Sequence, residues 1–225
     1  MPLFPGEFRE KLEVICTELG LFPYELLLTA IPALPERPMN LNCTLGCNVT
    51  ALASIENKAS VKASFNCEID NSDFKVEKVV TLESGERRDV PIVFEPTSLG
   101  TVSATLAITS PVAGNFSFPI IGKCGFPKPQ GPFILTPGGS VNINFKNIFR
   151  VTKKFSVTVN LPVFTVKKTA DTVQPKKELA IKVTLAAAGK KTMTFPIYGK
   201  LVVSCDDMEM KNIQWTYFLK GVIES

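Results

Sequence analysis

The sequence contains no histidine among its 225 residues, and this absence removes the commonest general base and metal ligand. Catalytic triads that depend on imidazole are excluded with it. The sequence also lacks the GxxxxGK[ST] and GxGxxG loops that hold phosphates in nucleotide-binding proteins. We therefore expect no catalytic residue, no cofactor, no metal and no small-molecule substrate, and we predict that the chain is not an enzyme.

Carboxylate pairs are the remaining candidates for catalysis, and they lie in polar segments that are typical of turns. Asp70 and Asp73 form one such group, and Asp206, Asp207 and Glu209 form another. Without an imidazole or a metal motif nearby, solvated surface charge explains both groups better than acid–base chemistry. We interpret them as turn residues.

Long hydrophobic runs and helical periodicity are absent too. The longest apolar run, LLLTAI from Leu26, has the length of a strand and is far too short to span a bilayer. The first residues, MPLFPGEFREKL, lack the basic and then apolar layout of a signal peptide, so we expect no export signal. A content of 45% apolar and 20% charged residues is typical of a globular protein.

The six cysteines include no CxxC pair, so their spacing does not favour a zinc site. Four of them lie in runs typical of strands and are interpreted as buried free thiols of a reducing compartment: Cys16, Cys67, Cys124 and Cys205. A short disulfide between Cys43 and Cys47 stays open. Asn-x-Ser/Thr triplets, which matter only in an exported protein, begin at Asn42, Asn48 and Asn115.

Alternating apolar residues are abundant and indicate β-strands. In residues 100–125, Val102, Leu106 and Ile108 alternate with small or polar residues, and a second alternating segment contains Phe118. The segment SPVAGN between them carries proline, glycine and asparagine, which favour a reversal of the chain. This stretch predicts two antiparallel strands joined by a turn.

The same hairpin pattern occurs three times. The copy at the amino terminus aligns Gly6, Phe8, Leu12 and Val14 with Gly100, Val102, Leu106 and Ile108. Its second half aligns Tyr24, Leu26, Leu28 and Ala30 with Phe116, Phe118, Ile120 and Gly122. A looser copy near the carboxyl terminus contains Tyr198, Leu201, Val203, Trp215, Tyr217, Leu219 and Gly221. Recurrence at the spacing of a small domain is typical of a tandem array.

We therefore predict an all-β chain of tandem immunoglobulin-like β-sandwiches, preceded by a hairpin left from an earlier module. Residues 1–31 form the closing hairpin of that incomplete module, and residues 32–38 are a proline-rich linker. Residues 39–125 form the first complete sandwich, residues 126–132 a second proline-rich linker, and residues 133–225 the second sandwich.

Charge is distributed unevenly along the chain. Residues 1–125 hold 10 basic and 15 acidic residues, a net charge of −5, whereas residues 126–225 hold 15 and 6, a net charge of +9. Four lysine doublets contribute to this basic half: Lys153 and Lys154, Lys167 and Lys168, Lys176 and Lys177, Lys190 and Lys191. They are either solvated strand ends or a face for an acidic partner. Nucleic acid is not expected, because the aromatic residues among them fall at core positions.

Four short features give the chain a resemblance to a known family. They are Ile55-Glu56-Asn57 near the end of an early strand, Phe94-Glu95-Pro96, the hairpin entry Gly100-Thr101-Val102, and Gly122 at the end of the hairpin. Together they resemble the ASH and major-sperm-protein-like modules of hydin-like cilia- and flagella-associated proteins. The second module keeps Lys146-Asn147 and Gly221, and it shows Val183-Thr184-Leu185 in place of Phe-x-Pro.

This resemblance implies a non-enzymatic scaffold of the axoneme, acting in the assembly and motility of a cilium or sperm flagellum. The implied location is the cytoplasm and its cytoskeleton, in the axoneme of a cilium or flagellum. The implied partners are other axonemal or central-apparatus proteins, including tubulin, with no membrane span and no nucleic acid. Two alternatives stay open: an extracellular adhesion or receptor fragment, and an adaptor of the sperm-protein type that binds acidic peptide motifs through Lys153 and Lys154.

Overall fold

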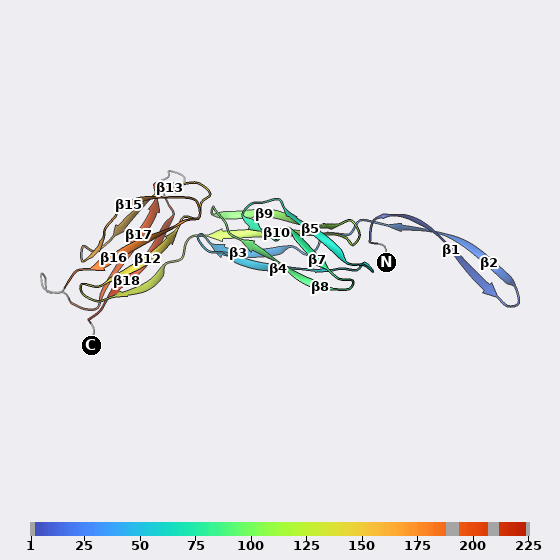
Figure 1. Ribbon diagram of the computed structural model, residues 1–225, viewed down its shortest axis with the longest axis horizontal. Coiled ribbons are helices and arrows are strands. Elements are labelled where there is room, and N and C mark those ends of the chain that lie inside the picture. Colours follow the sequence, from blue (N-terminus) through green and yellow to red (C-terminus); the bar gives the residue numbers. More distant parts are fainter. Residues whose placement is uncertain (1–2, 188–193, 207–211, 224–225) are drawn as a thin grey trace. The chain divides into compact units, whose positions relative to one another are not determined.

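A computed structural model of the protein describes residues 3–187, 194–206 and 212–223, which form β-strands and no helix (Figure 1). The first two strands, β1 (Gly6–Cys16) and β2 (Gly20–Ala30), form an antiparallel pair of their own. The remaining strands belong to two sets, each with a five-stranded and a three-stranded sheet. This arrangement confirms the predicted all-β class and the tandem sandwiches.

The first set contains a five-stranded sheet in the order β3-β10-β9-β5-β7 and a three-stranded sheet in the order β4-β8-β6. Its strands are β3 (Met39–Thr44), β4 (Val49–Glu56), β5 (Ala63–Ile69), β6 (Phe74–Lys75), β7 (Val79–Leu82), β8 (Arg87–Phe94), β9 (Gly100–Ser110) and β10 (Gly114–Gly125). Alternate residues are buried in most of these strands, as the period of two requires when one face meets a core.

The second set repeats the first with every strand moved on by eight, giving the orders β11-β18-β17-β13-β15 and β12-β16-β14. Its strands are β11 (Gln130–Leu135), β12 (Ser140–Lys146), β13 (Lys153–Val159), β14 (Phe164–Val166), β15 (Ala170–Val173), β16 (Glu178–Leu185), β17 (Ile197–Cys205) and β18 (Gln214–Gly221). The two sets therefore share one topology.

The chain divides into two compact units. The first comprises Met1–Leu41, Val49–Phe94 and Thr101–Gly122, and the second comprises Asn42–Asn48, Glu95–Gly100 and Lys123–Ser225. The second unit thus includes two short segments that precede residue 101 in the sequence. The limits of the modules and of the linkers at 32–38 and 126–132 stay a prediction.

Residues 74–82, a short stretch without proline or glycine, form two strands in different sheets. β6 pairs with β8 in the three-stranded sheet, and β7 pairs with β5 in the five-stranded sheet. The corresponding strands β14 and β15 also lie in different sheets, and β15 was missed by the sequence analysis. Alternation cannot reveal such a crossing, because the apolar residues stay on the core side in both sheets.

Asn57, one of the residues that carry the resemblance, is completely buried and holds two loops together. Its side-chain Nδ2 donates hydrogen bonds to the carbonyl oxygens of Val61, Leu82 and Glu83, at 2.8, 3.1 and 3.1 Å. Its Oδ1 accepts one from the backbone N–H of Ala59 at 3.0 Å. The amide of Asn57 therefore supplies hydrogen bonds to these backbone groups in place of water.

Asn147 makes the same arrangement in the second unit. Its Nδ2 donates to the carbonyl oxygens of Val151, Val173 and Gln174, at 3.0, 2.9 and 3.1 Å, and its Oδ1 accepts from the backbone N–H of Phe149 at 2.9 Å. The predicted correspondence between Asn57 and Asn147 is therefore a correspondence of structure. Asn57 directly follows β4 and binds the end of β7 and the loop before β8. Asn147 directly follows β12 and binds the end of β15 and the loop before β16.

The phenylalanine and the glycine of the resemblance contact each other. A Cβ added to Gly122 would lie 2.5 Å from Cζ of Phe94, whose ring stacks on Phe74 at a centroid distance of 4.6 Å. In the second unit a Cβ on Gly221 would lie 2.9 Å from Cδ2 of Leu185. Glycine is required at both positions because each lies against a side chain of the opposite sheet.

The pairing of strands also corrects the alignment of the second module with the first. Phe164 pairs with Leu185 in the same way that Phe74 pairs with Phe94. The residue equivalent to Phe94 is therefore Leu185, and the predicted replacement of Phe-x-Pro by Val183-Thr184-Leu185 is wrong by two residues. A shift of two keeps the same face toward the core, so the pattern of alternation could not detect the error.

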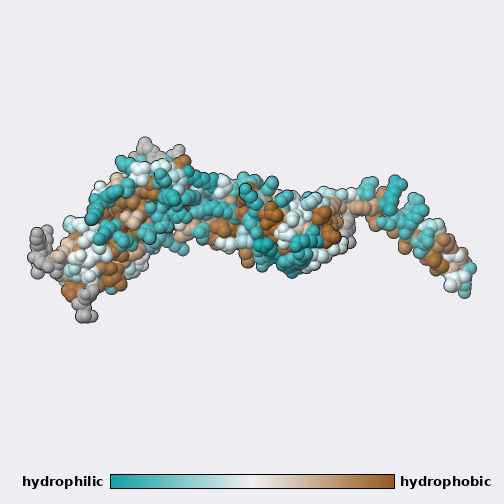
Figure 2. Space-filling model, viewed as in Figure 1, coloured by the Kyte–Doolittle hydropathy of each residue, from teal (hydrophilic) through white to brown (hydrophobic). Residues whose placement is uncertain are grey.

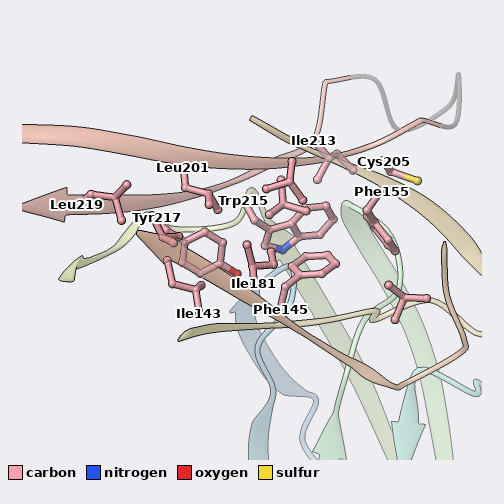
Figure 3. Packing of buried hydrophobic residues seen from close by; sticks show 14 of the residues in the cluster. Ile143, Phe145, Phe155, Ile181, Leu201, Cys205, Ile213, Trp215, Tyr217 and Leu219 are labelled. Carbon is pink, nitrogen blue, oxygen red and sulfur yellow. The ribbon is translucent and has the colours of Figure 1, made fainter. Parts of the chain in front are cut away.

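The core of the second unit is centred on Trp215 (Figure 3). The rings of Phe145 and Phe155 lie 5.1 and 6.3 Å from the indole, in nearly perpendicular orientations that suit aromatic pairs. Tyr217 is buried beside them. Their strand, β18, lies between β11 and β17, so it is not an edge of its sheet.

Candidate interaction surface

Three of the four predicted lysine doublets lie at the ends of strands. Lys153 and Lys154 begin β13, Lys167 and Lys168 follow β14, and Lys176 and Lys177 immediately precede β16. Lys190 and Lys191 lie outside the residues that the structure describes. The described doublets therefore match the interpretation as strand ends, and their role as a surface for partners stays a prediction.

Three of these lysines contact a carboxylate in the second unit. Nζ of Lys154 lies 3.5 Å from Oδ2 of Asp206, and Nζ of Lys168 lies 3.1 Å from Oδ2 of Asp171. The hydrogen bond from Lys168, with one from the backbone N–H of Thr172, holds the pKa of Asp171 below its usual value. Exposed pairs of this kind add little stability, but they neutralise part of the positive charge.

Lys176 belongs to a group of three charged residues that is less exposed to solvent than these pairs. Its Nζ and that of Lys146 lie 3.4 and 3.2 Å from Oε1 of Glu95, whose side chain is only 12% exposed. Two cations around one shielded carboxylate offset the cost of removing that charge from water. Lys176 is therefore largely engaged in structure, and Glu95, the middle residue of Phe-x-Pro, was not found by sequence reasoning.

A pocket of about 250 Å³ brings two of the predicted lysines to a concave surface in the second unit. Its apolar lining comes from Val157 on β13, Val166 on β14 and the β16 residues Leu179, Ala180 and Ile181. Its charged lining consists of Lys167, Lys168, Asp171 and Lys182. The pocket combines an apolar floor with an excess of positive charge, which suits an acidic segment that carries an apolar side chain.

Lys182 is the residue of this pocket that the sequence analysis missed. It is a single lysine in the alternating strand β16, where an outward position is ordinary for a charged residue. No doublet or spacing separates it from other surface lysines. Its nearness to Lys167 depends on the pairing of β14 with β16, which the sequence does not specify.

The carboxylates considered for catalysis have structural roles. Oδ1 of Asp70 accepts a hydrogen bond from the backbone N–H of Thr105 at 2.8 Å, and Asp206 pairs with Lys154. Asp73 is buried, which differs from the solvated position that we expected. Asp207 and Glu209 lie outside the described residues. Within the described part of the chain, no group of three or more His, Cys, Asp or Glu residues could hold a metal ion.

All six cysteines are free thiols, and Cys67, Cys124 and Cys205 are buried, while Cys16 is half-buried. Cys43 and Cys47, whose pairing was left open, form no disulfide, and Sγ of Cys43 lies 4.0 Å from the carbonyl oxygen of Cys47. Burial raises the pKa of the Cys43 and Cys67 thiols. Separately, no helix in the described ranges is long and apolar enough to cross a membrane.

The chain is similar to two very large proteins along nearly all of its length. It is 37% identical to hydrocephalus-inducing protein of Mus musculus over 229 residues, which cover 98% of this chain and 4% of that protein. It is 36% identical to the hydrocephalus-inducing protein homolog of Homo sapiens, with the same coverage. The chain is a hydin-like segment. It spans only a small part of the relatives that it matches, and no family model matches it.

Solved structures of similar fold were also found for this hydin-like chain. SSP-19, an MSP-domain protein like family member of Caenorhabditis elegans, has a TM-score of 0.31 and 12% identity, covering 38% of this chain and 94% of that one. The ASH/PapD-like domain 7 of human CEP192 has a TM-score of 0.34 and 13% identity, covering 40% and 82%. These scores are low, so the fold assignment rests on the strands and sheets described above.

Proposed function

We propose that this hydin-like chain is a non-enzymatic structural segment of a ciliary or flagellar axonemal protein. It serves the assembly and motility of the cilium or flagellum through contacts with other proteins of the axoneme or central apparatus, including tubulin. The observation that carries the proposal is the 37% identity to hydrocephalus-inducing protein over 98% of the chain. Serially linked sandwiches also suit this role, because each module adds a rigid element with its own surface.

The location can be tested by tagging the endogenous parent protein in ciliated or sperm cells. We expect the signal to follow the axoneme and to remain there after detergent removes the membrane. A diffuse cytosolic signal, or one at the cell surface that detergent releases, would overturn the proposal. Mass spectrometry of the native protein adds an independent readout, because glycans on Asn42, Asn48 or Asn115 would favour the alternative of an extracellular adhesion or receptor fragment.

A second candidate function, the capture of an acidic segment by an adaptor, is favoured by the pocket that Lys167, Lys168 and Lys182 line. We infer that a glutamate-rich segment with one aliphatic side chain would place its apolar group on Leu179 and its carboxylates near the lysines. Such binding would weaken as ionic strength rises, because the charges at the rim are exposed to solvent.

A titration with a glutamate-rich peptide that contains a single leucine tests this contact. Lys167→Glu combined with Lys182→Glu is expected to weaken binding at least tenfold, whereas Lys123→Glu, an exposed lysine outside the pocket, should have little effect. If Lys153→Glu with Lys154→Glu abolishes binding while the pocket variants do not, the adaptor uses the other predicted lysines. If no variant changes binding, both sites are excluded.

A further inference from the structure

A second pocket of the second unit lies beside the aromatic core and shares no lining residue with the pocket around Lys167. It has a volume of about 210 Å³. Its walls come mainly from residues 44–47 at the end of β3, residues 127–130 at the start of β11, and the strands β12 and β18. All of these segments belong to the second unit, so the pocket is a feature of that unit alone.

Two buried side chains of β18 present polar groups to this pocket. Trp215 and Tyr217 are only 5 and 3% exposed, and both line the pocket wall. Neither the indole N–H nor the phenol hydroxyl forms a hydrogen bond with another described residue. In the described chain, Oε1 of Glu77 is the only fully enclosed side-chain oxygen or nitrogen without a partner, so these two groups are not enclosed. They open onto the pocket, and Figure 3 shows the indole nitrogen and the phenol oxygen turned toward the space between the two rings.

Gly46 keeps the approach to the indole open. A Cβ at this position would lie 3.2 Å from Nε1 of Trp215, and the φ of +97° favours glycine. The turn itself is fixed, because Leu45 is buried in the core cluster of the second unit and its backbone N–H donates to the carbonyl oxygen of Gly125 at 2.9 Å. The residue without a side chain therefore lies beside the indole N–H.

The charged lining of the pocket is entirely basic. Lys128 and Lys146 line it, and no aspartate or glutamate of the described chain does. Nζ of Lys146 lies 3.2 Å from Oε1 of Glu95, which offsets the charge of this lysine. Lys128 is exposed and forms no ion pair with any described residue. One uncompensated positive charge therefore lies at the pocket.

The two polar groups of the inner wall act as hydrogen-bond donors. An indole N–H can only donate, and burial raises the pKa of Tyr217 to about 12, so its hydroxyl keeps the proton at neutral pH. Leu45, Phe145 and Ile148 make another part of the wall apolar. Figure 2 shows hydrophilic and hydrophobic residues side by side on the visible face of the second unit, so hydropathy alone does not distinguish this pocket. The inner donors do, and they suit a negatively charged acceptor carried on a short apolar chain.

We propose that this pocket binds the side-chain carboxylate of a glutamate in an acidic segment of another protein. The carboxylate oxygens accept hydrogen bonds from the N–H of Trp215 and the hydroxyl of Tyr217, and Lys128 offsets their charge. The two methylene groups of the glutamate pack against Phe145 and Ile148. A volume of about 210 Å³ suits one side chain of this kind and is below the ~300–1,000 Å³ of sites that hold whole small molecules.

A glutamate side chain fits the pocket better than the carboxyl terminus of a chain. The terminal carboxylate lies next to a backbone N–H, which would enter the apolar part of the pocket and need an acceptor there. In glutamate, two methylene groups separate the carboxylate from the backbone, so the backbone N–H stays at the rim in contact with water. The proposed site is apart from the pocket around Lys167 and does not depend on a ciliary location.

Trp215 is the only tryptophan of the chain, so its fluorescence reports directly on this pocket. The 225-residue chain is titrated at low ionic strength with a blocked pentapeptide that carries one glutamate among alanines. We expect a saturable change in fluorescence, and binding about tenfold weaker when glutamine replaces the glutamate. The absence of a saturable change, or equal binding of the two peptides, would overturn the proposal. A response only to pentaalanine with a free carboxyl terminus would also overturn it, because the ligand would then be a terminal carboxylate.

Two variants test whether the peptide occupies the pocket. Tyr217→Phe keeps the ring and removes the hydroxyl, and we expect it to weaken binding about tenfold. Lys128→Gln changes an exposed residue whose loss does not disturb folding, and it should weaken binding about threefold. The matched control is Lys123→Gln, at an exposed lysine outside the pocket, which should leave binding unchanged. Binding that neither Tyr217→Phe nor Lys128→Gln weakens would contradict the proposed site.

The pocket around Lys167 provides a second control. Lys167→Glu combined with Lys182→Glu should leave the response of Trp215 nearly unchanged, because the two pockets share no lining residue. If this combination abolishes binding while Lys128→Gln does not, the peptide occupies the other pocket. The present proposal then fails, whereas the proposed capture of an acidic segment at Lys167 and Lys182 is supported.

Discussion

The two sandwiches keep the same hydrogen-bonded junction but build different cores around it. Asn57 and Asn147 make equivalent sets of bonds, and the strand orders are identical. The first sandwich places Phe94 against Gly122, while the second places Leu185 against Gly221. Hydrogen bonds need fixed atoms at fixed distances, whereas apolar volume can be redistributed among neighbours, so the junction is less free to vary than the packing.

The largest effect that we predict concerns the aromatic core of the second unit. Trp215→Ala removes a buried indole that contacts Phe145 and Phe155, and we expect it to lower the free energy of unfolding by about 4 kcal/mol. Phe116 occupies the aligned position of the first sandwich and is only partly buried. Phe116→Ala should cost less than half as much in urea denaturation, and equal costs would contradict the difference between the cores.

The asparagine junction should be equally important in both sandwiches. Asn57→Ala and Asn147→Ala each leave one buried carbonyl group, two partly buried carbonyl groups and one buried N–H without the asparagine partner, and we expect a loss of about 3 kcal/mol for each. Thermal unfolding monitored for each unit gives the comparison. Asn144→Ala, an exposed residue of β12, is the control and should change stability by no more than about 0.5 kcal/mol.

The contact between Gly122 and Phe94 can be tested by substituting each residue alone and both together. Gly122→Ala forces a Cβ into the ring of Phe94, and we expect it to destabilise the first unit by about 2 kcal/mol. Adding Phe94→Leu introduces the residue type that the second unit uses at this position and should recover part of that loss. A double-mutant cycle measures this coupling, and strictly additive effects would show that the two residues do not interact.

The last prediction is a dependence of stability on pH, confined to the alkaline range. Burial raises the pKa of Tyr217 from 10.0 to about 12, so the unfolded chain loses this proton before the folded chain does. Stability contributed by the neutral phenol is complete below pH 10 and should fall between pH 10 and 12, by up to about 1.4 kcal/mol per pH unit. Denaturant titrations of the native protein and Tyr217→Phe check this. A slope that is unchanged in Tyr217→Phe would assign the effect to other groups.

Much of the fold follows from local features of the sequence. Alternation along residues 100–125 predicts both strands of that hairpin, and the aligned asparagines predict that the sandwiches correspond. The three lysine doublets that the structure describes lie at strand ends, as the adjacency of two charged residues indicates. The division of residues 74–82 between two sheets, and the two-residue shift at Leu185, were missed because neither changes which face a residue presents.

The candidate site was less accessible to prediction. Lys167 and Lys168 were identified, but their neighbour Lys182 and the apolar floor formed by Leu179 and Ile181 were not. The shielded group formed by Glu95, Lys146 and Lys176 was missed as well, because the two lysines lie about 50 and 80 positions from Glu95 in the sequence. Such groupings depend on which strands pair, and many pairings satisfy the same alternation.

The sequence by itself determined most of the strands, the inner face of each of these and the recurrence of one module, because these depend on the order of apolar and polar residues along the chain. Only the tertiary structure decided which sheet each strand joins, which side chains meet across the core, and which lysines share a pocket. The physical reason is that side-chain alternation is a local property with a period of two, whereas sheet pairing and packing are set by contacts between distant residues.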